Sequence, residues 1–229
     1  MFERLWCLHD PEPRTGPVNM ALDEQMLEYA AANRTPVLRT YRWSEPFISI
    51  GYFDRIDAIE ARFPGRPIVR RWTGGGAVDH RADFTFALAV PADHPLARRP
   101  AAQRYCAIHQ GVARALERWG IATESAAPAP RTARGASPVP CFESAVGGDL
   151  MVGEQKAVGG AQRRTRLGVL HQGSIQTPAL PADWFGIGSA LASALASEQM
   201  PVRSAAELLD RASAVAASKY DTQAWQRAR

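Results

Sequence analysis

The 229-residue sequence contains few cysteines and few lysines, and it has no long apolar segment. No apolar run approaches the roughly 20 residues that a membrane-spanning helix needs, so we expect no membrane association. The first six residues include an acid and lack an apolar signal region, which argues against secretion. Cys7, Cys106 and Cys141 form no C-x-x-C pair, which argues against a disulfide framework and a zinc knuckle. We therefore expect a cytoplasmic protein.

Other absences narrow the class of protein further. The five histidines are scattered without paired spacing, so we predict no metal site. The net charge of +4 is mildly basic, but no block of cations is long enough to form a nucleic-acid-binding arm. We therefore expect no nucleic-acid partner. A chain of this length that is 46% hydrophobic can build its core without disulfides or metals.

The patterning predicts one α/β domain over residues 1–229, with a mixed sheet flanked by helices. Apolar residues recur at helical spacing in residues 17–33, 56–63 and 101–119. Alternating or short apolar runs predict strands at residues 37–43, 47–52, 67–72, 84–90, 149–152, 157–163 and 168–176. The strand at 84–90 has one bulky face and one small face, which predicts that it is half buried. Residues 126–140 contain four prolines and predict a mobile loop, and the pattern after Pro178 is helical to the end.

Three consecutive glycines, Gly74–Gly76, follow a predicted strand and the arginines Arg70 and Arg71. Glycines allow a ligand to approach the backbone amides closely, and arginines can supply charge to a phosphate or a carboxylate. A tight turn with solvated arginines is an equally good interpretation of these residues alone. The segment is not a P-loop, because no Gly-Lys-Ser/Thr follows.

Lysine is rare in this chain, since only Lys156 and Lys219 occur among 27 cationic residues. Lys219 lies in a polar helical stretch, where we expect it to be solvated. Lys156 ends a predicted turn that begins at Gly153, and Gly159 and Gly160 follow it. A compact ammonium there could approach an acyl carbonyl, although an exposed hairpin lysine is the simpler interpretation. Arg163, Arg164 and Arg166 would line one rim of this region.

Cys141 differs from the other two cysteines because it ends the proline-rich loop, fifteen residues before Lys156. A lone cysteine is more often a buried small hydrophobe than a nucleophile, and we hold that interpretation for Cys7 and Cys106. A cationic neighbour would lower the pKa of Cys141 and raise its thiolate fraction. The residues by themselves leave both roles open.

Taken together, these segments resemble the lipoate–protein ligase and octanoyltransferase family, which shares a catalytic domain with biotin protein ligases. The resemblance runs in order from about residue 17 to about residue 178, and residues 179–229 would be a helical C-terminal extension. It is carried by Asn19–Glu24, by Tyr41-x-Trp43 with Ser49–Tyr52, by Arg70-Arg71-x-Thr73-Gly74-Gly75-Gly76-Ala77-Val78-x-His80, by Lys156-x-x-Gly159-x-Ala161-Gln162-x-Arg164, and by His171–Ile175.

The resemblance implies a mixed-sheet fold like that of biotin protein ligases and class II synthetases, and transfer of an octanoyl or lipoyl group to one lysine of a lipoyl domain. It implies that Cys141 and Lys156 are catalytic. It also implies that the following residues bind substrate: Arg71, Gly74, Gly75, Gly76, Ala77, His80, Gly159, Ala161 and His171. Thr85, Ala87 and Ala89 could form a wall of the acyl tunnel.

Cys141-Phe142 resembles the cysteine-type octanoyltransferases, which take the acyl group from acyl carrier protein and need no cofactor. The acceptors implied are lipoyl-domain proteins such as the glycine cleavage H protein or dehydrogenase E2 subunits. An ATP-dependent lipoate ligase, which would need ATP and Mg, stays open, and so does an amidotransferase. A protein that only binds lipoyl or carrier proteins, without catalysis, is a further alternative. Such a protein would not need Cys141 and Lys156 at the positions where the family has them.

Overall fold

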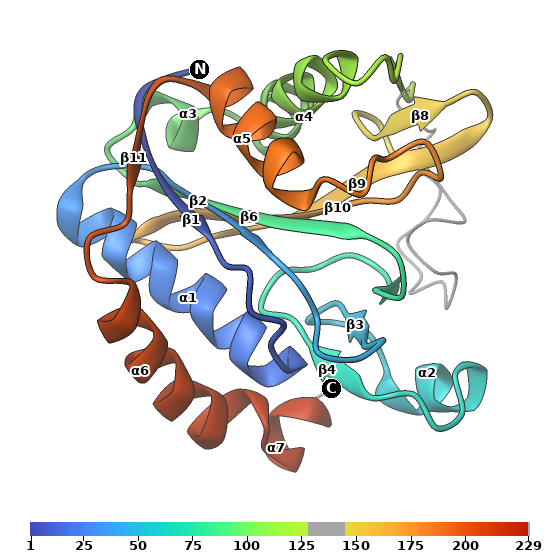
Figure 1. The fold of residues 1–229 in the computed structure, drawn as a ribbon. Coiled ribbons are helices and arrows are strands. Elements are labelled where there is room, and N and C mark those ends of the chain that lie inside the picture. The colour runs from blue at the N-terminus through green and yellow to red at the C-terminus, as the bar shows by residue number, and fades with distance from the viewer. Residues whose placement is uncertain (128–144, 229) are drawn as a thin grey trace.

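The computed structural model describes residues 1–127 and 145–228 as a large mixed sheet with helices on both faces and a small second sheet beside it (Figure 1). Within these residues the large sheet consists of β1 (Phe2–His9), β2 (Val37–Tyr41), β6 (Phe84–Pro91), β7 (Glu124–Ser125), β8 (Leu150–Val152), β9 (Gln155–Arg164), β10 (Gly168–Ile175) and β11 (Ala196–Pro201). Their spatial order is β11–β1–β2–β6–β10–β9–β8–β7. Strand β1 runs parallel to β2 and β11, and the remaining pairs are antiparallel.

The small sheet positions the glycine-rich segment. It consists of β3 (Ile48–Ile50), β4 (Ile68–Arg70) and β5 (Val78–Asp79), in the order β4–β3–β5. Strands β4 and β5 flank residues 71–77, so the glycines lie in the connection between two strands that both pair with β3.

Helices cover both faces of the large sheet, and Figure 1 shows them as two layers. The helices are α1 (Gly16–Asn33), α2 (Ile56–Arg62), α3 (Pro95–Arg98), α4 (Ala101–Glu117), α5 (Trp184–Leu195), α6 (Ala205–Val215), the π-helical turn η1 (Ala216–Tyr220) and α7 (Gln223–Gln226). One apolar core contains Ile108 of α4 and Leu191 of α5, and a second contains Met26 of α1 and Leu208 of α6. Because both faces are covered, every residue of β6 is buried, and the prediction that this strand is half buried is wrong.

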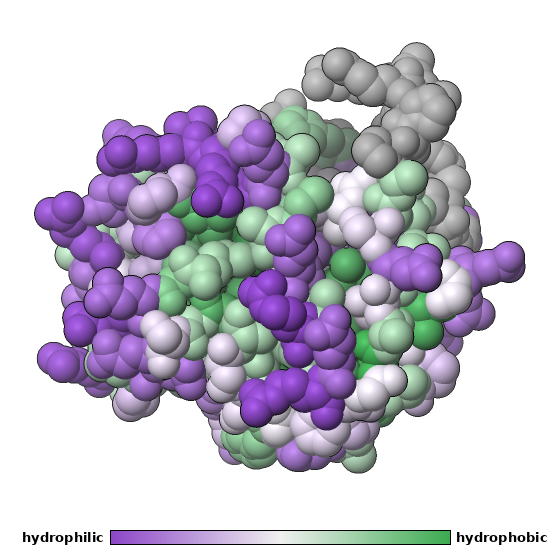
Figure 2. All heavy atoms as spheres, turned by 90° about the horizontal axis from the view of Figure 1, so that it is seen from above, coloured by the Kyte–Doolittle hydropathy of each residue, from purple (hydrophilic) through white to green (hydrophobic). Residues whose placement is uncertain are grey.

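The face formed by α4 and α5 is seen from above in Figure 2, where apolar side chains lie among hydrophilic ones. Phe185 at the start of α5 and Trp119, two residues after the end of α4, are exposed. Isolated apolar side chains of this kind are common on protein surfaces. In the described residues, no helix combines the length and apolar character needed to cross a membrane.

The predicted helices at 17–33, 56–63 and 101–119 and the predicted strands are confirmed, with boundaries shifted by a few residues. The prediction that the chain is helical from Pro178 to the end is wrong at β11, which adds a parallel strand beside β1. In this edge strand only Ala196 is buried, and the other residues up to Pro201 are largely exposed. An exposed strand needs no alternation of apolar and polar residues, so the segment lacks the pattern by which strands are predicted. Its pairing partner lies almost two hundred residues away, so no local pattern predicts it.

Candidate active site

A cavity lies between the large sheet, the small sheet and α1. Small residues of β9, Gly159 and Ala161, form part of its wall, and Met20 of α1 and Val78 of β5 contribute apolar surface. Strand β10 adds Gln172 and Ser174, which pair with Ala161 and Gly159 in register. We call this space the inner cavity. Glycine and alanine at these β9 positions leave room that larger side chains would fill.

A second, more open space of about 300 Å³ adjoins the inner cavity, and we call it the outer cleft. Its wall includes Gly74 and Gly75 of the glycine segment and Tyr105 of α4. Gly160 and Ala161 line both the inner cavity and the outer cleft. The two spaces therefore share this part of β9 as a wall.

The glycine segment is held by the side chain of Arg71, which is buried. Its Nη2 donates to the carbonyl oxygens of Gly74 at 2.8 Å and Gly76 at 2.9 Å, and its Nη1 donates to the Ser49 carbonyl oxygen at 2.9 Å. Gly75 has a φ of +87°, which favours glycine, and a Cβ on Gly51 would overlap its carbonyl oxygen. Arg71 thus lines the inner cavity while its guanidinium organises the turn.

Arg70 lies behind the turn and binds the C-terminal segment instead of lining either space. Its Nη1 donates to the Asp54 carbonyl oxygen at 2.8 Å, and its Nη2 donates to the Gln226 carbonyl oxygen at 2.8 Å. The backbone N–H of Arg70 also donates to Gln226 Oε1 at 2.8 Å, and Trp225 Nε1 donates to the Arg70 carbonyl oxygen at 3.0 Å. Side chains of α7 therefore complete the hydrogen bonding of the β4 edge.

Lys156 lies inside β9, so the prediction that it ends a turn is wrong. The turn between β8 and β9 consists only of Gly153 and Glu154, because Gln155 already pairs with Val152. The Lys156 side chain is 2% exposed, and its Nζ lies 2.8 Å from Asp149 Oδ2. An ammonium tolerates such burial when a carboxylate compensates its charge.

Asp149 and Tyr105 are two site residues that the sequence analysis missed. Asp149 is fully buried, and it accepts hydrogen bonds from the Tyr105 hydroxyl and from the Val146 backbone N–H. The Tyr105 hydroxyl also accepts from the Gly160 backbone N–H at 2.8 Å. Tyr105 therefore connects the wall of the outer cleft to the Asp149–Lys156 ion pair. An acid at the first position of the predicted strand 149–152 was the available signal for Asp149.

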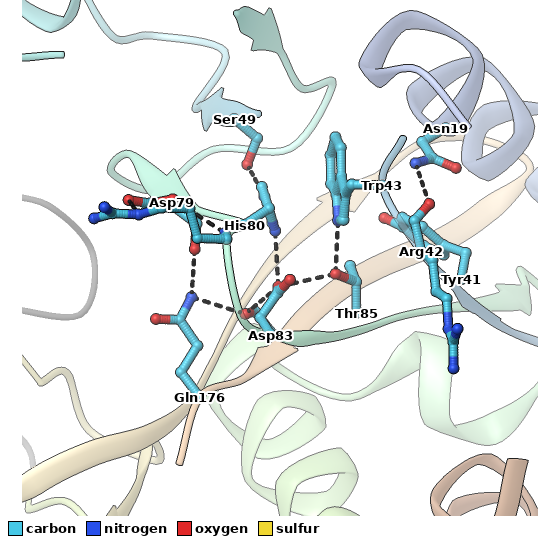
Figure 3. A network of polar contacts seen from close by, with 12 residues as sticks. Asn19, Tyr41, Arg42, Trp43, Ser49, Asp79, His80, Asp83, Thr85 and Gln176 are labelled. Atoms are coloured by element: carbon cyan, nitrogen blue, oxygen red, sulfur yellow. Dashed lines mark hydrogen bonds and ion pairs between the residues drawn. The ribbon is translucent and has the colours of Figure 1, made fainter. Parts of the chain in front are cut away.

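His80 stands at the centre of a hydrogen-bond network in the inner cavity (Figure 3). Its Nδ1 lies 2.7 Å from Asp83 Oδ2, and its Nε2 lies 2.7 Å from Ser49 Oγ. The imidazole stacks on the Trp43 ring with a centroid distance of 3.9 Å. Ser49 and Asp83 were not predicted as site residues, because their link to His80 depends on how β3, β5 and β6 are packed.

His171 faces the opposite side of the sheet from the inner cavity. Its ring packs against Phe86, Tyr105 and His109, beneath α4. Burial, with a smaller contribution from neighbouring His109, lowers the pKa of His171 well below the usual value. A Cβ on Gly160 would lie 2.6 Å from His171 Nε2, so the histidine occupies space that a larger residue at 160 would need.

The remaining predicted residues divide between the site and its surroundings. Ala77 packs into the apolar cluster of the small sheet. Of the proposed tunnel wall, Thr85 lines the inner cavity, whereas Ala87 and Ala89 pack into the core beneath α1. Cys141 lies outside the described residues. Burial raises the pKa of Cys7 to about 12, which makes this thiol a poor nucleophile.

Two basic residues lie in aromatic surroundings. Lys219 Nζ is 4.5 Å from the centroid of the Trp225 ring and 5.0 Å from that of Trp72, and it pairs with Glu24 Oε2 at 2.6 Å. Lys219 is therefore only partly solvated, with 26% of its side chain exposed. Arg163 lies over Trp72 and donates to its carbonyl oxygen, so only Arg164 and Arg166 of the expected basic rim are exposed.

The fold and the site define an α/β enzyme that encloses a small, largely apolar cavity between two sheets. Residues 15–204 match the lipoyl protein ligase A/B catalytic domain. The chain belongs to this family, and it is an enzyme of the family. The resemblance carried by the sequence motifs is thereby confirmed.

Curated relatives match most of the chain. The octanoyltransferase LipM of Oceanobacillus iheyensis is 30% identical over an alignment of 229 positions, which covers 98% of this chain and 81% of that protein. In further LipM octanoyltransferases the match covers 60–69% of the relative's length.

Solved structures agree with the fold. Protein Ta0514 of T. acidophilum with bound lipoic acid superposes with a TM-score of 0.75 at 20% identity, over 100% of both chains. A lipoate-protein ligase A bound with ATP superposes with a TM-score of 0.72 at 19% identity, over 98% of both chains. The predicted mixed-sheet fold is confirmed.

Proposed function

We propose that the chain transfers an octanoyl or lipoyl group to a specific lysine of a lipoyl domain, and that the group passes through a thioester on Cys141. The observation that carries this proposal is the inner cavity, whose β9 wall is reduced to Gly159 and Ala161, in a chain that matches an octanoyltransferase over nearly its whole length. The space measures about 30 Å³ and is mostly apolar, so its walls would have to move apart to admit an unbranched acyl chain.

The outer cleft supports the same proposal. It adjoins the inner cavity at Gly160 and Ala161, so an acyl chain in the cavity would present its carbonyl end toward the cleft. The thiol that donates the acyl group and the lysine that accepts it would both reach the carbonyl through the outer cleft. The exposed Arg164 and Arg166 would favour an acidic donor such as acyl carrier protein through charge complementarity.

Lys156 would support the reaction electrostatically. Its ammonium lies in a buried position on the same strand as Gly160, and a cation in a low-polarity environment stabilises a developing oxyanion more strongly than it would in water. Cys141 would attack the donor thioester and then release the acyl group to the amine. Exchange between thioesters is nearly balanced in free energy and amide formation is downhill, so this route needs no cofactor.

An ATP-dependent ligase is the second candidate, because an ATP-bound lipoate-protein ligase shares the fold. That route would require ATP and Mg, and cationic groups to hold the triphosphate. The guanidinium groups of Arg70 and Arg71, which precede the glycine turn, bind backbone carbonyl oxygens of the protein itself. This arrangement favours the route without nucleotide.

Intact-protein mass spectrometry after incubation with octanoyl-carrier protein, without ATP, tests the proposal. We expect a gain of one octanoyl group that hydroxylamine removes and that is missing in Cys141→Ala. Subsequent addition of a lipoyl domain should transfer the group to the domain. If no adduct forms, and if acyl transfer requires ATP and free lipoate, the chain is a ligase and Cys141 is not a nucleophile.

A further inference from the structure

Ser49, His80 and Asp83 form a continuous line of hydrogen bonds along the inner cavity (Figure 3). Ser49 Oγ lies 2.7 Å from His80 Nε2, and His80 Nδ1 lies 2.7 Å from Asp83 Oδ2. Ser49 and His80 both line the cavity. A hydroxyl, an imidazole and a carboxylate in this order are the groups of a serine nucleophile with its general base.

The direction of these hydrogen bonds follows from the surroundings of Asp83. Its Oδ2 also accepts from the hydroxyls of Thr85 at 2.9 Å and Ser174 at 2.6 Å, so the carboxylate acts only as an acceptor. We assign the proton of a neutral His80 imidazole to Nδ1, beside this acceptor, so that its Nε2 is left to accept the proton of Ser49. This is the tautomer that a general base for Ser49 requires.

The orientation of the imidazole is also restrained. Trp43 stacks on His80 at an interplanar angle of 21°, and Trp43 Nε1 donates to Thr85 Oγ1 at 2.8 Å. The ring of His80 is thus held on one face by Trp43 and at one edge by Asp83. Restraint of this kind keeps a base aligned with its nucleophile.

Positive charge lies next to the hydroxyl. Arg71 Nη1 donates to Ser49 Oγ at 2.9 Å, so a cation contacts the atom on which negative charge would develop. The hydroxyl oxygen faces a guanidinium while its proton faces a base. Both contacts favour the ionised form of the hydroxyl.

We propose that Ser49 is a second acyl acceptor of this protein and that, through it, the chain hydrolyses activated esters and thioesters of unbranched fatty acids. The inference rests on the proposed function only in that an acyl chain occupies the inner cavity; here the chain lies with its carbonyl at Ser49 instead of at the outer cleft. Ser49 Oγ bonds to the acyl carbonyl carbon as its proton passes to His80, and the alcohol or thiol leaves with that proton. Water then adds to the ester, gives its proton to His80, and the carboxylic acid leaves as Ser49 regains a proton.

Hydrolysis of p-nitrophenyl octanoate by the Cys141→Ala protein tests this inference, because that variant lacks the thiol route. We expect nitrophenolate release together with an octanoyl adduct on the peptide that contains Ser49, and neutral hydroxylamine should leave this ester intact. Adding Ser49→Ala or His80→Asn should lower the rate by about 100-fold or more. Ser189→Ala, which removes an exposed hydroxyl of α5, is the matched control and should change nothing.

Ser49→Cys keeps the shape of the site, so it tests the inference even if the Ser49→Ala protein does not fold. In the Cys141→Ala background its adduct should become a thioester that hydroxylamine removes. Equal hydrolysis rates with and without Ser49, or an adduct on another residue, would overturn the inference. Failure of the proposed function is distinguishable, because it would appear as loss of octanoyl transfer from carrier protein to lipoyl domain in the chain that retains Cys141.

Discussion

Lys156 Nζ lies 2.8 Å from Asp149 Oδ2, and both side chains are almost completely buried. This ion pair joins the first residues of β9 to the residue that precedes β8. Asp149 in turn accepts from Tyr105, whose hydroxyl binds the backbone of Gly160, a residue that lines both the cavity and the cleft. The position of the lysine is therefore set by groups from three separate segments.

Removing one partner of this pair should destabilise the fold. Asp149→Leu removes the carboxylate that pairs with the buried ammonium of Lys156, and we expect the free energy of unfolding to fall by about 3–5 kcal/mol. Replacing both residues, as in Asp149→Leu with Lys156→Met, should cost less than the two single changes together. Urea denaturation of the four proteins measures this double-mutant cycle, and purely additive losses would contradict a direct interaction.

Lys156→Arg should lose most of the octanoyl transfer activity although the charge is kept. The buried position fits a compact ammonium, and a planar guanidinium would need a wider space and different hydrogen-bond geometry. We expect the transfer rate to a lipoyl domain to fall at least about tenfold, with carrier-protein affinity little changed. Lys219→Arg is the matched control at the other lysine, and an unimpaired Lys156→Arg enzyme would make Lys156 structural.

Stability should decrease below neutral pH because of His109. Burial lowers the pKa of His109 from 6.5 to about 4. Above pH 6.5 the residue is neutral in both states and has no effect, whereas between pH 6.5 and 4 only the unfolded chain binds the proton. Each pH unit in this window should cost about 1.4 kcal/mol. Denaturation at pH 7 and pH 5 measures the slope. Burial also lowers the pKa of His171, which adds to the slope in the same direction. His109→Gln should therefore reduce the slope by the contribution of His109 and leave the remainder; an unchanged slope would contradict this assignment.

The C-terminal helix should affect activity through Arg70. Gln226 and Trp225 bind the backbone of Arg70, which immediately precedes the residue that organises the glycine turn. We expect Gln226→Ala to raise the KM for the acyl donor and to lower Tm by a few degrees, because losing partners of buried polar groups costs about 1–3 kcal/mol. Gln223→Ala, at an exposed position of the same helix, is the control. Equal KM values for the two variants would exclude coupling between α7 and the turn.

Local patterns of the sequence determined the helices α1 and α4, the hairpin strands β9 and β10, and the glycine turn. They did so because apolar periodicity and glycine act over a few residues, and the family motifs follow the same local segments. The role of Cys141 stays a prediction from those motifs.

Only the tertiary structure decided which groups meet. Asp149 becomes the partner of Lys156, the guanidinium of Arg71 binds the turn that follows it, and His171 faces α4 instead of the cavity. Strand β11 exists because β1 offers an edge almost two hundred residues away. Pairing of buried polar groups and strand edges depends on distances through space, which the order of residues along the chain does not encode locally.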